Sequence, residues 1–230
     1  LTYRFGYAAL RRALRSGRLD GLDVNLISET QHWWLRYHSA RTIPGRFRGS
    51  PLPEREKAVA VFGSSEPVAG DPLYEEARRV GNLLASSGFR VVSGGYGGVM
   101  EGASRGAREA GGHSIGVTTS VLRRGGANPF LSEEQREPDL FLRTRRLIEL
   151  SDAYIILRGK SGTLAELMFL WALNRGGLLP STRIVLLGDF WGEILGSLKN
   201  LNMLETEQMA ITRMVRTPEQ AVEQIASFFR

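Results

Sequence analysis

The sequence contains no cysteine, and this absence removes several kinds of chemistry at once. Disulfides, thiolate nucleophiles, iron–sulfur clusters and Cys-based zinc sites are all excluded. Histidine is scarce too, and none of His32, His38 and His113 has a histidine partner at the spacing that places two metal ligands on one helix face. We therefore expect no metal. A cysteine-free chain fits the cytosol best, so a cytoplasmic location is expected.

Long apolar runs are missing as well. No run reaches the roughly 18 apolar residues that a transmembrane helix needs, so no membrane contact is expected. The chain has 230 residues, of which 42% are hydrophobic and 23% charged. This composition is ordinary for a globular protein and predicts one large or two small soluble domains.

The net charge of +6 is confined to the start of the chain. Residues 1–50 hold nine arginines against three acidic residues, whereas residues 51–230 hold equal numbers of basic and acidic side chains. A segment rich in proline, glycine and charge follows at 41–56, so we expect a basic helical arm and linker at 1–56 and one domain at 57–230.

The basic arm has two interpretations. Its arginines, together with Trp33, Trp34 and Tyr37, could bind nucleic acid or an anionic surface, because arginine contacts phosphate and aromatic rings stack on bases. Alternatively, the aromatic side chains pack on the following domain or on a second subunit while the arginines remain solvated. We favour the second interpretation, so nucleic acid is not an expected partner.

Short apolar runs alternate with amphipathic segments over the rest of the chain. Five runs read as strands, at 58–62, 89–92, 114–117, 153–157 and 183–187, and helical patterns follow at 72–87, 99–110, 139–150, 162–174, 191–198 and 218–229. Buried apolar strands separated by helices indicate a mostly parallel sheet with helices on both faces. The predicted fold class is therefore doubly wound α/β, a Rossmann-like nucleotide-binding domain.

Three turns rich in glycine and hydroxyl groups follow successive predicted strands. Such turns expose backbone N–H groups at helix N-termini and let an anion approach closely, and in parallel sheets they share one edge. The predicted binding residues for a phosphorylated small molecule are Gly63, Ser64 and Ser65, then Gly94, Gly95, Gly97, Gly98, Met100 and Glu101, then Gly159, Lys160, Ser161, Gly162 and Thr163. The dinucleotide fingerprint and the P-loop spacing are both absent, and no cofactor is expected.

Two ionisable residues beside these turns are candidates for catalysis. Glu166 lies one turn into the helix after the third glycine turn, where its carboxylate would stand beside a bound ligand, or would simply favour the helix dipole. Arg143 begins the run R-T-R-R in the helix at 139–150 and could clamp an oxyanion, or could belong to a solvated helix face.

These motifs together resemble the LOG family, the cytokinin riboside 5′-monophosphate phosphoribohydrolases. The resemblance covers about residues 57–200 and rests on the glycine-rich stretch at 94–107, the helix of Arg143, the strand at 151–157 and the segment at 159–166. The sequence keeps four residues of the family motif P-G-G-x-G-T-x-x-E, namely Gly159, Gly162, Thr163 and Glu166. Three positions differ from the family: Arg158 replaces proline, Lys160 the second glycine, and Thr144 the lysine of an Arg-Lys pair.

The resemblance implies an activity, site roles and an assembly. A nucleoside 5′-monophosphate would lose its base by hydrolysis of the N-glycosidic bond, with Glu166 and Arg143 serving the reaction and the glycine turns holding the 5′-phosphate. The protein would form a homodimer or a higher homo-oligomer, with the helix of Glu166 near the subunit boundary. The alternative is a non-catalytic carrier or sensor of a phosphorylated ligand, similar to molybdenum cofactor carriers or nucleotide-binding proteins, which the altered Arg158-Gly159-Lys160 turn favours.

Overall fold

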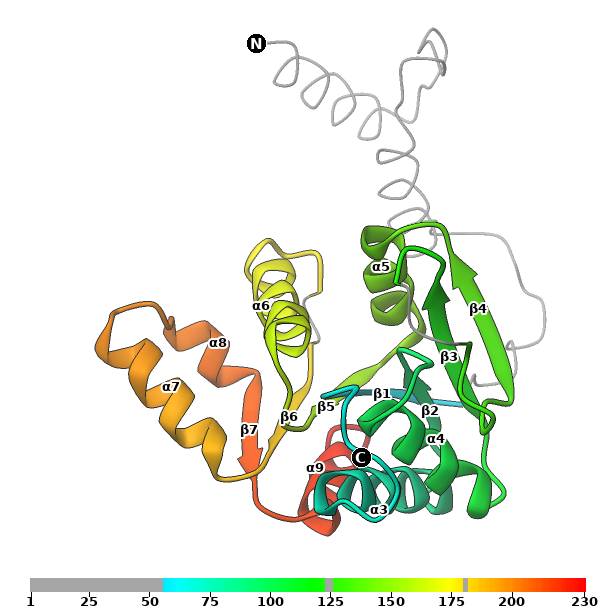
Figure 1. Cartoon of the computed structure of the whole chain (residues 1–230). Helices are drawn as coiled ribbons and strands as arrows, with labels where there is room; N and C mark the ends of the chain where they lie inside the picture. Colours follow the sequence, from blue (N-terminus) through cyan, green and yellow to red (C-terminus); the bar gives the residue numbers. More distant parts are fainter. Residues whose placement is uncertain (1–55, 123–125, 180–181) are drawn as a thin grey trace, which may run out of the picture. The chain divides into compact units, whose positions relative to one another are not determined.

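The computed structural model describes residues 56–122, 126–179 and 182–230 (Figure 1). The predicted basic arm therefore lies outside the described residues, apart from Glu56, and its two interpretations stay predictions. Within the described residues no helix combines the length and the apolar character needed to cross a membrane.

The described residues form a seven-stranded sheet in which every pairing is parallel. The strands run in the order β4-β3-β2-β1-β5-β6-β7, so the chain starts at the centre and builds outward in both directions. Their bounds are β1 Ala58–Phe62, β2 Arg90–Ser93, β3 Ser114–Thr119, β4 Glu133–Glu137, β5 Ala153–Ile156, β6 Ile184–Leu187 and β7 Thr212–Val215. The predicted doubly wound α/β fold is confirmed.

Helices cover both faces of this sheet (Figure 1). One layer contains α3 Pro72–Ser86, α4 Val99–Glu109 and α9 Pro218–Ser227, and the other contains α5 Leu140–Leu150, α6 Ser161–Arg175 and α7 Phe190–Asn200. A short helix, α8 Thr206–Ala210, precedes β7. Two helices begin in the way that the sequence favours: Asp139 and Thr217 accept the N–H groups of Leu142 and Gln220, and Pro218 follows Thr217 at the first helical position.

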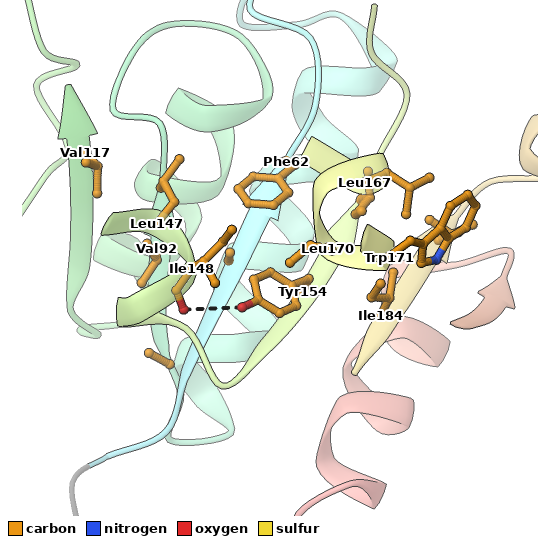
Figure 2. Close-up of a cluster of buried hydrophobic side chains, with 14 of the residues drawn as sticks. Phe62, Val92, Val117, Leu147, Ile148, Tyr154, Leu167, Leu170, Trp171 and Ile184 are labelled. Atoms are coloured by element: carbon orange, nitrogen blue, oxygen red, sulfur yellow. Dashed lines mark hydrogen bonds between the residues drawn. The ribbon is translucent and has the colours of Figure 1, made fainter. Parts of the chain in front are cut away.

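The central strands are buried on both faces, and this burial explains why they appear as continuous apolar runs. In β1, Ala58, Ala60 and Phe62 point into one hydrophobic cluster, whereas Val59 and Val61 point into the other. Figure 2 shows the first cluster, in which Phe62 and Tyr154 from the sheet meet residues of α5 and α6. The Tyr154 hydroxyl donates a hydrogen bond to the Ile148 carbonyl (3.3 Å), so this polar group is satisfied inside the core.

The sequence patterns do not predict the two edge strands, β4 and β7, or the short helix α8. The β4 strand has the sequence EEQRE with no apolar residue, and the β7 strand exposes Arg213 and Met214. An edge strand pairs on one side, and its side chains stay partly exposed, so it needs no apolar run and leaves little signal in the sequence. Their backbone pairing with β3 and β6 holds them in place.

Candidate functional site

The three glycine-rich turns meet at one edge of the sheet. They follow β1, β2 and β5, and β1 lies between the other two strands in the sheet. Because all three strands are parallel, their carboxyl ends lie at the same edge, where ligands bind in such folds. A cavity of about 320 Å³ opens there, between the turns and the starts of α5 and α6.

The structure brings eleven of the sixteen predicted site residues to the wall of this cavity. They are Gly63, Ser64, Ser65, Gly94, Met100, Arg143, Lys160, Ser161, Gly162, Thr163 and Glu166. The other wall residues are Phe62, Glu66, Tyr96, Leu122 and Leu140, which the sequence analysis did not single out. Four of these five lie within three residues of a predicted site residue, so proximity in the chain was the one signal that could have found them.

Five predicted residues do not line the cavity, namely Gly95, Gly97, Gly98, Glu101 and Gly159. Glu101 instead accepts a hydrogen bond from the hydroxyl of the buried Tyr74 (3.0 Å), so its carboxylate is held against α3. Gly98 has a φ of +72°, and a Cβ there would run into the backbone of Ser65. A Cβ at Gly159 would overlap the side chain of Thr163. Close packing within the protein therefore accounts for the glycines at Gly98 and Gly159.

Gly162 differs from these packing glycines. It lies in the first turn of α6 and lines the cavity, and beyond its chain neighbours and the nearby backbone of α6 a Cβ there would have no protein atom within 4 Å. Protein packing therefore does not explain this glycine. Lys160 occupies the N-cap position of α6 and its side chain makes no capping hydrogen bond. The N–H groups of the first turn thus lie beside open space at the positive end of a 15-residue helix.

Arg143 is a buried residue of the cavity wall and is held on several sides. Its Nε donates to the Val117 carbonyl (2.8 Å) and its Nη2 donates to the Gly94 carbonyl (3.1 Å). The guanidinium also lies over the ring of Tyr96, with 5.7 Å between the Cζ atom and the ring centroid. A Cβ at Gly94 would collide with the guanidinium, which explains the glycine at that position.

Tyr96 is itself fixed by its hydroxyl group. The hydroxyl donates to the Thr119 carbonyl (2.7 Å) and accepts from the Thr119 N–H (2.8 Å). The ring therefore has one orientation, and Arg143 is packed against a rigid surface. Nothing in the sequence pattern indicates this contact, because Tyr96 lies in the turn after β2 whereas Thr119 ends β3, 23 residues further along the chain.

Glu166 faces the cavity beside Arg143. Its Oε1 lies 3.9 Å from Arg143 Nη1, and its side chain is 16% exposed. Burial raises the pKa of Glu166 to about 7, although the positive charge of Arg143 acts in the opposite direction. A carboxyl group with a pKa near neutrality can both carry a negative charge and accept a proton under physiological conditions.

The three residues that differ from the family pattern make different contacts, and only Lys160 lines the cavity. Lys160 lines the cavity and its Nζ lies 2.6 Å from Oε1 of Glu66, so the extra cation neutralises an acidic residue on the rim. Thr144 donates its hydroxyl to the Leu140 carbonyl within α5 and does not line the cavity. Arg158 lies outside the cavity too, with its guanidinium over the ring of Phe190. In the part of the chain that the structure describes, no cluster of three or more His, Asp or Glu residues is placed to hold a metal ion.

The doubly wound sheet, the glycine turns at its carboxyl edge and the buried acid define a Rossmann-like α/β protein with a candidate anion site. Comparison with known proteins identifies the family within this class of fold. The sequence profile of the SLOG cluster4 family matches residues 56–208, and the chain belongs to that family.

Named relatives confirm the resemblance to LOG proteins. A protein of Mycobacterium tuberculosis, named cytokinin riboside 5′-monophosphate phosphoribohydrolase, is 31% identical over 161 residues, which are 69% of this chain and 84% of the relative. Two solved structures share the fold. The molybdenum cofactor binding protein from Rippkaea orientalis has a TM-score of 0.60 at 24% identity, covering 77% of this chain and 99% of that chain. The Moco carrier protein from Chlamydomonas reinhardtii has a TM-score of 0.60 at 19% identity, and the match covers 76% of this chain and 98% of that chain.

Proposed function

We propose that this protein hydrolyses the N-glycosidic bond of a nucleoside 5′-monophosphate to release the free base and ribose 5-phosphate. One observation carries the proposal: a largely buried carboxyl group, that of Glu166, faces the same cavity that the glycine-rich turns line. The name of the relative from Mycobacterium tuberculosis describes the same reaction class and supports the proposal.

The phosphate would bind at the start of α6. Gly162 leaves room there, Ser161 and Thr163 flank it with hydroxyl groups, and the helix dipole favours a negative charge. Ser64 and Ser65 on the neighbouring turn would contact the phosphate or the base. Binding energy from the phosphate, which does not react, would then position the ribose C1′ atom for attack.

Glu166 would act on the reacting bond. As the C1′–N bond breaks, its electron pair leaves with the base and positive charge develops on the ribose ring. The Glu166 carboxylate would stabilise that charge and accept a proton from the attacking water, whose oxygen forms the new bond to C1′. The proton would then pass to the departing base, which restores the carboxylate.

Arg143 would act as a positioning residue for this carboxylate. Two of its nitrogens donate to backbone carbonyl groups, and its Nη1 lies toward Glu166. Its charge favours the ionised form of Glu166 and so opposes the effect of burial.

The direct test is release of free base from the 5′-monophosphates of adenosine, guanosine, cytidine and uridine and from a cytokinin riboside 5′-monophosphate, separated by chromatography. Glu166→Gln removes the charge while keeping the shape, and Glu193→Gln is the matched control, because Glu193 is exposed in the first turn of α7. We expect release by the wild type and the control and a loss of at least about 100-fold in Glu166→Gln. Equal release by all three proteins, or release from none of the nucleotides, would contradict the proposal.

A second candidate is a carrier or sensor that binds a phosphorylated ligand without turnover. The specific observation in its favour is Lys160, which puts a long side chain on the cavity wall where the LOG motif has glycine and pairs there with Glu66. The titles of the two solved structures describe proteins that bind or carry molybdenum cofactor. Tight binding of a nucleotide or of molybdenum cofactor in calorimetry, without base release, would favour this candidate.

We also propose that the protein forms a homodimer through α5 and α6. These helices pack on the same face of the sheet and expose large apolar side chains, those of Leu140, Phe141, Leu142, Met168 and Phe169. Phe141 is 84% exposed, an unfavourable state for so large an apolar group. Light scattering after size-exclusion chromatography should give twice the chain mass, and Phe169→Glu should reduce it to the monomer. A wild-type monomer would contradict the proposal.

A further inference from the structure

The two backbone carbonyl groups that accept hydrogen bonds from Arg143 belong to different segments of the fold. Gly94 begins the turn after β2, whereas Val117 lies in β3. The parallel pairing of β2 with β3 ends at Ser93 and Gly116, one residue before each acceptor. The orientation of the guanidinium therefore depends on how this turn is held against β3.

Tyr96 bonds the turn to the strand just beyond these acceptors. Its hydroxyl donates to the Thr119 carbonyl (2.7 Å) and accepts from the Thr119 N–H (2.8 Å). Tyr96 lies two residues after Gly94, and Thr119 lies two residues after Val117. Both Tyr96 and Thr119 are buried, so these hydrogen bonds are shielded from water. The hydroxyl thus acts as a clamp between the two segments that carry the acceptors of Arg143.

The ring of Tyr96 adds a third contact to the guanidinium. The Arg143 Cζ atom lies 5.7 Å from the ring centroid, so the ring supports the guanidinium while the two carbonyl groups accept from its Nε and Nη2. The remaining nitrogen, Nη1, lies 3.9 Å from Oε1 of Glu166. A charge that is held in place in this way needs little reorganisation when it acts on a neighbouring group.

The position of Arg143 matters because it sets the charge beside Glu166. The other charged side chains of the cavity wall are Lys160 and Glu66, which pair with each other at the exposed rim (2.6 Å). Burial raises the pKa of Glu166, and the charge of Arg143 lowers it. If the guanidinium moved away, the effect of burial would be less opposed and the pKa of Glu166 would rise further.

We propose that Tyr96 is a positioning residue for base release: it clamps the turn after β2 onto the end of β3 and so holds Arg143 in the orientation that presents Nη1 to Glu166. Tyr96 acts through Arg143 and not on the substrate. The inference rests on the proposed function for the part that Glu166 plays in the reaction.

The test is a pH titration of the full-length chain, labelled with ¹³C at the glutamate carboxyl groups, by NMR. The Glu166 signal is the one that disappears in Glu166→Gln. Tyr96→Phe keeps the ring and removes the clamp, so it should increase the proton affinity of the Glu166 carboxyl about threefold or more. Where base is released, the rise of its rate with pH should move to higher pH with it.

Tyr74→Phe is the matched control for the loss of a buried tyrosine hydroxyl. Tyr74 bonds to Glu101 and neither residue lines the cavity, so the titration of Glu166 should stay as in the wild type. Asn128→Ala is a second variant in case Tyr96→Phe folds poorly. It removes the amide that donates to the Tyr96 carbonyl (3.1 Å) and should change the titration in the same direction.

A double-mutant cycle shows whether Tyr96 acts through the guanidinium. In an Arg143→Met background, Tyr96→Phe should no longer change the titration of Glu166, because the charge that it misplaces is gone. A change that persists in this background overturns the inference. An unchanged titration in Tyr96→Phe overturns it too, because a clamp that only stabilised the fold would lower the free energy of unfolding without affecting Glu166.

The titration needs no turnover, so its result is separate from that of the proposed function. A threefold change that vanishes in the Arg143→Met background supports the positioning of Arg143 by Tyr96 even where no nucleotide releases its base. Base release together with an unchanged titration leaves the proposed function standing and overturns only the role of Tyr96.

Discussion

Replacing Glu166 by glutamine should stabilise the folded protein above neutral pH. The carboxyl group is buried beside the cavity, and burial raises its pKa from the ordinary 4.5 to about 7. Between these two values the folded state holds a proton that the unfolded chain has lost. The stability that comes from the neutral carboxyl is fully present below pH 4.5 and is lost as the pH rises through 7.

The size of this loss follows from the pKa. Each pKa unit corresponds to about 1.4 kcal/mol, so the increase to about 7 corresponds to about 3 kcal/mol of unfolding free energy at high pH. Glutamine is neutral at every pH and does not incur this loss. The variant should therefore exceed the wild type by about 3 kcal/mol at pH 8.5 and by under about 1 kcal/mol at pH 5.

The assay is urea denaturation of the wild type and Glu166→Gln at several pH values between 5 and 8.5, with thermal denaturation in parallel. For a domain of this size the expected gain at pH 8.5 corresponds to an increase in Tm of about 6–12 °C. Glu193→Gln serves as the control and should follow the wild type across the range, because Glu193 is exposed and forms no ion pair within the described residues.

A constant difference in stability across this pH range would contradict the prediction. If Glu166→Gln and the wild type keep the same difference in stability from pH 5 to pH 8.5, then folding does not remove the carboxyl group from water. The candidate site would then lack the poised acid on which the proposed mechanism depends.

Three further predictions concern the walls of the cavity. Gly162→Ala should leave Tm unchanged but weaken nucleotide binding in calorimetry, because the added methyl group occupies open space that the ligand needs. Gly159→Ala should lower the free energy of unfolding in urea by about 1–3 kcal/mol, because its methyl group would overlap the Thr163 side chain. Arg143→Met removes the charge that lowers the pKa of Glu166, so the rise of base release with pH should move to higher pH in a pH–rate profile. Tyr96→Phe leaves two buried backbone groups without their hydroxyl partner and should cost about 1–3 kcal/mol in urea denaturation, with unchanged stability contradicting the contact.

Local patterns of apolar residues predict much of the fold. The run at Ala58–Phe62 is buried on both faces, so every one of its residues is apolar and the strand stands out in the sequence. The edge strand Glu133–Glu137 offers no such signal, because its side chains remain largely in contact with water and only its backbone pairs with the sheet. The sequence therefore predicts the strands at the centre of the sheet but not the strands at its edges.

For the candidate site, the chain pattern determined the glycine turns and the position of Glu166, because parallel strands bring their carboxyl ends to one edge and a residue one helical turn further on lies beside them. Only the tertiary structure determines which glycines face the cavity and which pack against neighbouring residues. It also determines that Arg143 packs against the Tyr96 ring and that Lys160 pairs with Glu66. Each of these depends on distances between turns that are far apart in the chain, and burial, which raises the pKa of Glu166, is a property of the assembled fold.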